Sequence, residues 1–148
     1  MTRNRCRRRG AAILESAIVY PLTLLFLIGL AVGGIGMFRY QQVASLAREG
    51  ARYASVRGGQ YAEDTGHPAA TADDVYQKVV LAKAAGLDPT QLDCSVTWNP
   101  DNWPSHVTSS TGSAAGSTIS VTVTYHWVPE AYLGGITLKS TAVLPMSY

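Results

Sequence analysis

The stretch AAILESAIVYPLTLLFLIGLAVGGIGMF, residues 11–38, decides the fold class of this chain. Glu15 carries its only charged side chain. As a helix with a rise of about 1.5 Å per residue, the stretch would extend about 42 Å. The hydrocarbon core of a bilayer is about 30 Å thick. We therefore predict a membrane-spanning helix over residues 11–38.

Basic residues gather on the N-terminal side of this stretch. The first ten residues hold five of the twelve lysines and arginines, which leaves seven basic residues against ten acidic ones, a net charge of −3, in the remainder. The body of the chain is therefore not a polybasic nucleic-acid binder. The positive-inside rule places the N-terminus in the cytosol and residues 39–148 outside the membrane.

An ordinary secretory signal peptide is a rival interpretation. Ala31 and Gly33 would supply a cleavage site before Gly34. Against it, the apolar run is long for a signal sequence and a helical pattern continues beyond Gly34.

Within the span, Pro21 predicts a kink. The four-residue spacing of Gly29 and Gly33 permits close helix approach, although lipid-facing glycines are an equal alternative.

The junction RRRGAAILE, residues 7–15, resembles the type IV prepilin processing motif. The resemblance implies a leader, residues 1–10, that a prepilin peptidase cuts between Gly10 and Ala11. Glu15 would then be the fifth residue of the product. The new amine of Ala11 is positively charged near neutral pH, and a glutamate of another subunit would neutralise it. Alternatively, Glu15 is an interfacial residue beside the arginines.

Two further blocks, LESAIVYPLTLLFLIG (14–29) and SLAREGARYA (45–54), resemble the TadE-like family of minor pilins or pseudopilins of the tight-adherence (Flp, type IVc) pilus. Ser16 departs from the aromatic residue common in related pilins. The resemblance implies pilus assembly or anchoring for cell adhesion, with pilin subunits, a prepilin peptidase and the assembly platform as partners, at the bacterial inner membrane. The residues that match are Glu15, Ala17, Pro21, Gly29, Ala47, Arg48, Glu49, Ala51 and Arg52.

Beyond the span, the chain is expected to continue as an amphipathic helix ending near Gly58 and Gly59. Arg48, Glu49 and Arg52 form its polar side, either as a solvated face with Glu49 reaching Arg52 or as subunit-subunit ion pairs. Its apolar stripe comprises Tyr40, Val43, Ala44, Ala47, Ala51 and Ala54.

A polar loop, GGQYAEDTGHP (58–68), is expected next, followed by a short helix within residues 71–89. Thr71 and Asp74 have the spacing of a capping box. Val75, Val79 and Ala82 form the predicted buried stripe. Gly86 should end this helix, and Pro89 prevents its continuation.

Three period-two segments, LDCSVTW (92–98), STISVTVTYHWV (117–128) and ITLKSTAVLPM (136–146), predict strands of an antiparallel sheet with one covered face. Pro145 is expected at a strand end or sheet edge. The fold class is α+β and pilin-like, with about three or four strands. In the long loop Asn99 to Gly116, we expect Trp103 either to form part of an interface with another molecule or to fold back and fill a gap in the packing of this chain.

No catalytic, cofactor or metal constellation emerges. The three histidines, His67, His106 and His126, lack metal-ligand spacing, and Cys6 and Cys94 would be separated by the membrane. Cys94 is expected to be a small apolar core residue. Two non-enzymatic classes remain: a pilin-like subunit, and a singly anchored extracytoplasmic module that binds through its long loop.

Overall fold

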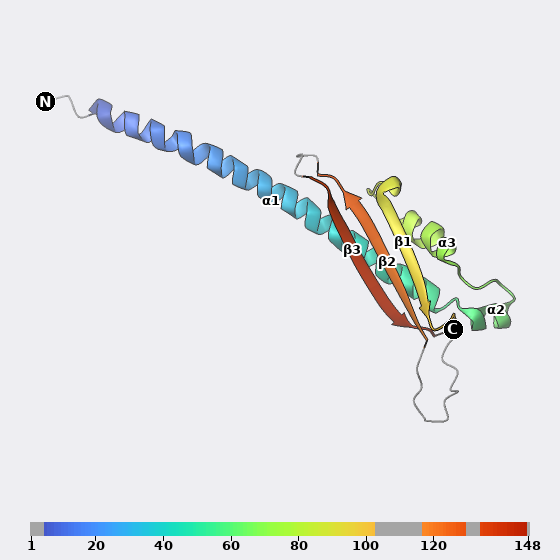
Figure 1. The fold of residues 1–148 in the computed structure, drawn as a ribbon. Coiled ribbons are helices and arrows are strands. Elements are labelled where there is room, and N and C mark those ends of the chain that lie inside the picture. Colours follow the sequence, from blue (N-terminus) through green and yellow to red (C-terminus); the bar gives the residue numbers. More distant parts are fainter. Residues whose placement is uncertain (1–4, 103–116, 130–133, 148) are drawn as a thin grey trace, which may run out of the picture. The chain divides into compact units, whose positions relative to one another are not determined.

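The structure, a computed structural model, describes residues 5–102, 117–129 and 134–147, without the side chains of residues 5–11. The chain divides into two units, residues 1–37 and 38–148. The loop residues 103–116, Trp103 and His106 among them, lie outside the described parts. The first unit contains the N-terminal portion of helix α1 (Arg5–Ser55), and the second contains the remaining elements (Figure 1).

The second unit holds the last part of α1, four short helical segments and one sheet. After α1 come α2 (Gly59–Thr65), α3 (Ala72–Val75), the π-helix η1 (Tyr76–Leu81) and the 3-10 turn η2 (Pro89–Gln91). The strands are β1 (Leu92–Asn99), β2 (Thr118–Trp127) and β3 (Ile136–Pro145). They form an antiparallel sheet in the order β1-β2-β3. The α+β, pilin-like fold class is therefore confirmed, with three strands.

The core lies between the C-terminal part of α1 and the sheet. The inward side chains of β2 alternate as predicted: Ile119, Val121 and Val123 are fully buried, and Tyr125 and Trp127 nearly so. From α1, the chain contributes small and branched side chains, Val43, Leu46, Ala47, Ala51 and Ala54. Burial of these apolar groups is the main driving force for this unit.

The predicted stripe of α1 is wrong at its N-terminal end. Tyr40 is 44% exposed and Leu46, which was not expected in the stripe, is buried. Glu49 also differs from expectation, because its carboxylate pairs with Lys83 and not with Arg52. The spacing of residues along a helix predicts only pairs within that helix, so it could not predict a pair between Glu49 and Lys83.

The polar segment 58–68 is not simply a loop. It contains α2, which starts after Gly58 and ends at Gly66. Gly66 has a φ of 70°, the left-handed conformation that closes many helices at glycine. The predicted end of α1 is close to the observed one, since α1 stops at Ser55, ahead of Gly58.

The next helix begins as the sequence predicts. Thr71 accepts a hydrogen bond from the backbone N–H of Asp74, and the Asp74 carboxylate accepts one from the N–H of Thr71. Hydrogen bonds from Lys78, then from Thr71, lower the pKa of Asp74 to about 2. The carboxylate therefore stays charged and the capping box intact down to low pH.

The buried stripe of this helix is only partly as predicted. Val75 and Val79 are buried, but Ala82 is exposed and Val80 is buried in its place. The cause is η1: a π-helical turn contains more residues than an α-helical one, so the inward position shifts. Gly86, with a φ of 77°, lies in the turn that follows.

Replacing Thr71 with alanine tests the capping box. Thr71→Ala should lower the free energy of unfolding by about 1 kcal/mol, because it removes the acceptor for the Asp74 N–H. Denaturant unfolding monitored by circular dichroism measures this loss. The contribution of ionised Asp74 to the free energy of unfolding is complete above its ordinary pKa of about 4. It is lost as the pH falls toward its pKa of about 2 in the folded protein.

Asp73→Ala is the matched control, since Asp73 is exposed in the same first turn but caps nothing. It should cost only about 0.5 kcal/mol through the helix dipole. Equal losses for the two variants would contradict a specific capping role for Thr71.

Candidate functional site

The apolar part of α1 presents its large side chains outward. Ile13, Leu25 and Phe26 are about two-thirds exposed, as are most others in residues 13–38. Among the described residues, α1 is the one helix long and apolar enough to cross a membrane, judged by length and composition. An N-terminal helix of this kind is consistent with single-pass membrane anchoring.

Two hydroxyl groups of this apolar part are satisfied within the helix. The hydroxyl of Ser16 donates to the carbonyl of Ala12 at 2.8 Å, and that of Thr23 donates to Val19 at 2.8 Å. These bonds remove the cost of carrying unpaired hydroxyl groups into hydrocarbon. Glu15 has no such arrangement, since among the described residues no group forms an ion pair with its exposed carboxylate.

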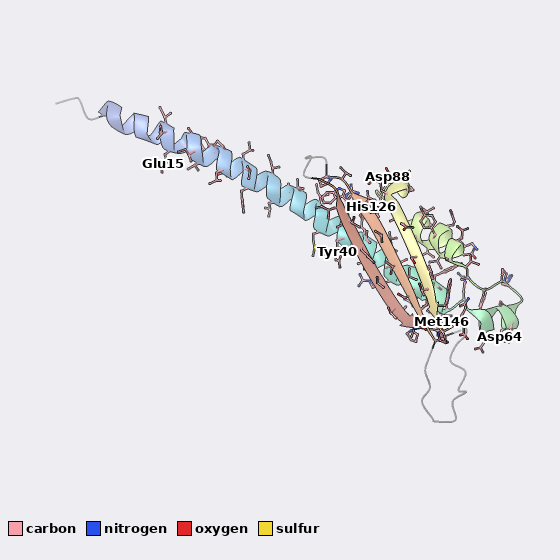
Figure 2. The ribbon with its side chains drawn as sticks, in the orientation of Figure 1. Glu15, Tyr40, Asp64, Asp88, His126 and Met146 are labelled. Atoms are coloured by element: carbon pink, nitrogen blue, oxygen red, sulfur yellow. The ribbon has the colours of Figure 1, made fainter. Side chains whose placement is uncertain are left out.

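Glu15 lies on α1 near its N-terminus (Figure 2). The expected cleavage site, Gly10–Ala11, is part of the helical backbone of α1, and its side chains lie outside the description. Four residues of an α-helix, about 6 Å of rise, separate Ala11 from Glu15. Processing at Gly10 and a role for Glu15 in register therefore stay predictions.

Helix α1 is continuous through Pro21. A kink at Pro21 stays a prediction. A Cβ added at Gly29 or Gly33 would meet nothing within 4 Å. Their surfaces are open for another helix or for lipid, so neither of the two alternatives is decided.

The AREGAR block, residues 47–52, has two faces. Ala47 and Ala51 are fully buried, whereas Arg48 and Arg52 are exposed. Arg48 donates from Nε to the carbonyl of Ala44 at 3.2 Å. The block therefore packs through its small residues and presents two guanidinium groups outward.

Gly50 is the closest point of this packing. A Cβ placed there would lie 3.2 Å from Cγ1 of Val121 on β2 and 3.2 Å from Cγ1 of Val75 on α3. Both valines are fully buried, so neither has free space to move into. Gly50 allows α1 to contact the sheet and α3 at the same position.

Arg39 lies at the start of the part of α1 that belongs to the second unit, and it contacts Tyr125 and Trp127 near the C-terminal end of β2. Its Nη1 donates to the carbonyl of Gly86 at 3.1 Å and to the hydroxyl of Tyr125 at 3.3 Å. The guanidinium also lies 5.8 Å from the ring centroids of both Tyr125 and Trp127. Cation–π attraction and hydrogen bonds hold it in place.

The remaining candidate reactive groups are dispersed. His67 stacks on Tyr61, and His126 hydrogen-bonds Thr137 at 3.1 Å on the open face of the sheet (Figure 2). Burial raises the pKa of the Cys94 thiol to about 11, so it is almost wholly protonated near neutral pH. No group of three or more His, Cys, Asp or Glu suited to a metal occurs among the described residues.

In a comparison with known protein families, residues 10–52 match the family described as TadE-like protein. Residues 10–52 are a TadE-like domain. No curated protein and no solved structure matches the chain. The TadE-like domain implies a role in the biogenesis of Tad pili, and TadE-like proteins are generally non-enzymatic.

The TadE-like domain begins at the predicted cleavage site and ends at Arg52, within the packed part of α1. It includes every residue that the sequence assigned to processing, assembly or the family pattern. It also includes Gly50 and Arg39, to which the sequence reasoning gave no role.

The two omissions differ in kind. Gly50 had a detectable signal, because Ala47, Gly50, Ala51 and Ala54 place small residues on one helical face. Arg39 had none, because its partners Gly86, Tyr125 and Trp127 lie far along the chain.

Enlarging Gly50 tests the packing of the TadE-like domain. Gly50→Leu should destabilise the protein by about 2 kcal/mol, because overpacking between two buried valines costs more than the helix propensity returns. Ser45→Leu, an exposed position on the same helix, should change stability by no more than about 0.5 kcal/mol. Denaturant unfolding in detergent measures both, and a stable Gly50→Leu variant would contradict close contact at this position.

Proposed function

We propose that this protein is a minor pilin or pseudopilin that takes part in the assembly or anchoring of a tight-adherence, Flp-type pilus. The observation that supports this most directly is an exposed carboxylate, Glu15, in an apolar helix of a TadE-like domain, five residues after Gly10. An ionised carboxylate in a membrane helix costs about 2.5–3.5 kcal/mol and is usually paired. A partner on another subunit would offset that cost.

In this proposal a prepilin peptidase removes residues 1–10 on the cytosolic face. The free amine of Ala11 on one subunit then meets Glu15 of a neighbour as both leave water. An amine and a carboxylate each favour the charged form of the other, and a mismatched register leaves both unpaired. The contact therefore selects the axial position of an incoming subunit.

The rest of the helix suits lateral association within the membrane. Gly29 and Gly33 offer open, small surfaces, which permit close approach of a neighbouring helix. The arginines of the leader hold the N-terminus in the cytosol and direct residues 39–148 to the extracytoplasmic side. The partners are the bilayer, other pilin or pseudopilin subunits and the pilus assembly platform.

N-terminal sequencing of the protein from cells with an active prepilin peptidase tests the processing step. The expected first residue is Ala11, and Gly10→Leu should abolish this product, whereas Arg9→Lys should retain it. A chain that begins at Met1 or Thr2 would instead support a singly anchored binding module. A start near Gly34 would support ordinary secretion.

Glu15→Gln tests the assembly step, since it removes the charge and keeps the shape. Crosslinking between subunits through residues 11–38 and the yield of sheared pili should each fall at least about tenfold, because a charged hydrogen-bonded pair contributes about 1.5–3 kcal/mol. Glu49→Gln, the same change outside the apolar segment, should leave both measurements within about twofold. Normal crosslinking and normal pili in Glu15→Gln would refute the assembly role.

A further inference from the structure

The two edges of the sheet differ in how their backbone is protected. On β1, the hydroxyl of Tyr76 donates to the carbonyl of Leu92 at 3.3 Å, and the Asp93 carboxylate accepts from the N–H of Cys94 at 2.9 Å. Leu92 and Cys94 are two residues apart, so their backbone groups point to the same side of the strand. Side chains of the same chain thus occupy this edge.

The outer edge of β3 has no such protection among the described residues. The side-chain hydrogen bonds of β3 join Thr141 to Thr122 at 2.8 Å and Thr137 to His126 at 3.1 Å, both across to β2. Figure 1 shows β3 at one edge of the sheet, with β2 on one side and no further described strand on the other. An unpaired strand edge is a template for another strand.

A groove lies along this free edge. The inward residues of β2 are buried, but those of β3 are only partly covered, and Ile136 is 49% exposed. The result is a groove of about 550 Å³ between α1 and β3. Its lining is Ala44, Arg48, Arg52 and Ser140 to Leu144.

The groove is positively charged. Arg48 and Arg52 both line it, and no described carboxylate forms an ion pair with either. Glu49, which lies between them in the sequence, pairs with Lys83 instead. Two guanidinium groups beside a partly apolar strand therefore remain available for an external anion.

The spacing of the arginines matches an extended chain. Four residues along a helix separate them by about 6 Å. Side chains at alternate positions of a strand, which share one face, are about 6.6 Å apart. Carboxylates at alternate positions of a strand lying in the groove would therefore reach both guanidinium groups.

We propose that β3 binds an extended acidic segment of another protein, which adds to the sheet as a fourth strand. Its main chain pairs with the outer edge of β3, and two carboxylates on its inner face pair with Arg48 and Arg52. Main-chain hydrogen bonds supply affinity in such strand addition, and side chains on one face supply specificity. The inference rests on residues 38–148 and does not require processing at Gly10.

A second copy of this chain fits less well as the occupant. Its β1 edge is occupied by Tyr76 and Asp93. Pairing β3 with β3 of another copy would bring two arginine-lined grooves together, which like charges disfavour. Charge complementarity therefore selects an acidic segment from a different protein.

The test uses the full-length protein in detergent micelles and a blocked ten-residue peptide, TVTVEVEVTV, with its two glutamates on one face. The control peptide TVTVEETVTV places them on opposite faces. The first peptide should bind at least fivefold more tightly, as measured by fluorescence anisotropy of a labelled peptide. Hydrogen exchange should slow on binding in residues 136–145 and remain unchanged in β1.

Arg48→Gln and Arg52→Gln should each weaken binding about threefold, and the double variant about tenfold, since exposed ion pairs contribute modestly. Lys139→Gln is the matched control, because Lys139 is an exposed cation on the opposite face of β3. It should alter binding by less than twofold. Circular dichroism checks that every variant is folded.

Three results would overturn the proposal. The first is equal binding of the two peptides, and the second is a loss in Lys139→Gln as large as in the arginine variants, since each indicates nonspecific charge attraction. The third is slower exchange of residues 136–145 with increasing protein concentration in the absence of peptide, which would assign the groove to a second copy.

Discussion

The packing of small residues of α1 against buried valines is the constraint on which the second unit depends. At Gly50, one point of the helix meets both Val121 of β2 and Val75 of α3, and a single added carbon would lie 3.2 Å from each. Ala47, Ala51 and Ala54 extend this close approach along the helix. With its inward face fixed, the helix has only one direction left for its long side chains, which explains why Arg48 and Arg52 lie exposed.

Much of this fold follows from local patterns. Ile119, Val121 and Val123 alternate with threonine and serine, and a period of two has few solutions other than a half-buried strand. The capping box of Thr71 and Asp74 also involves neighbours only, and the structure confirms it. Such features are predictable because the residues that create them are close in the sequence.

The failures have the opposite cause. Val80, not Ala82, faces the core because the π-helical turn of η1 contains more residues than an α-helical turn. No residue in that segment predicts a π-helix from the sequence. Glu49 prefers Lys83, and Arg39 reaches Gly86 and Tyr125, through contacts that only the assembled fold creates. In the candidate site, the spacing of Gly10 and Glu15 could be read from the sequence because the two residues are only five positions apart. The partner proposed for Glu15 belongs to another subunit and so is not part of this chain.

The TadE-like domain includes the helix of this packing but not the sheet. The helix packs on the sheet through alanine and glycine, and at Gly50 this contact leaves no room for a larger side chain. The TadE-like match ends at Arg52, and the three strands lie outside it. The proposed processing and register need only N-terminal residues, whereas the free edge of β3 lies outside the TadE-like domain. The strand addition proposed for β3 therefore involves residues outside the TadE-like match, whereas the proposed anchoring and register depend on residues within it.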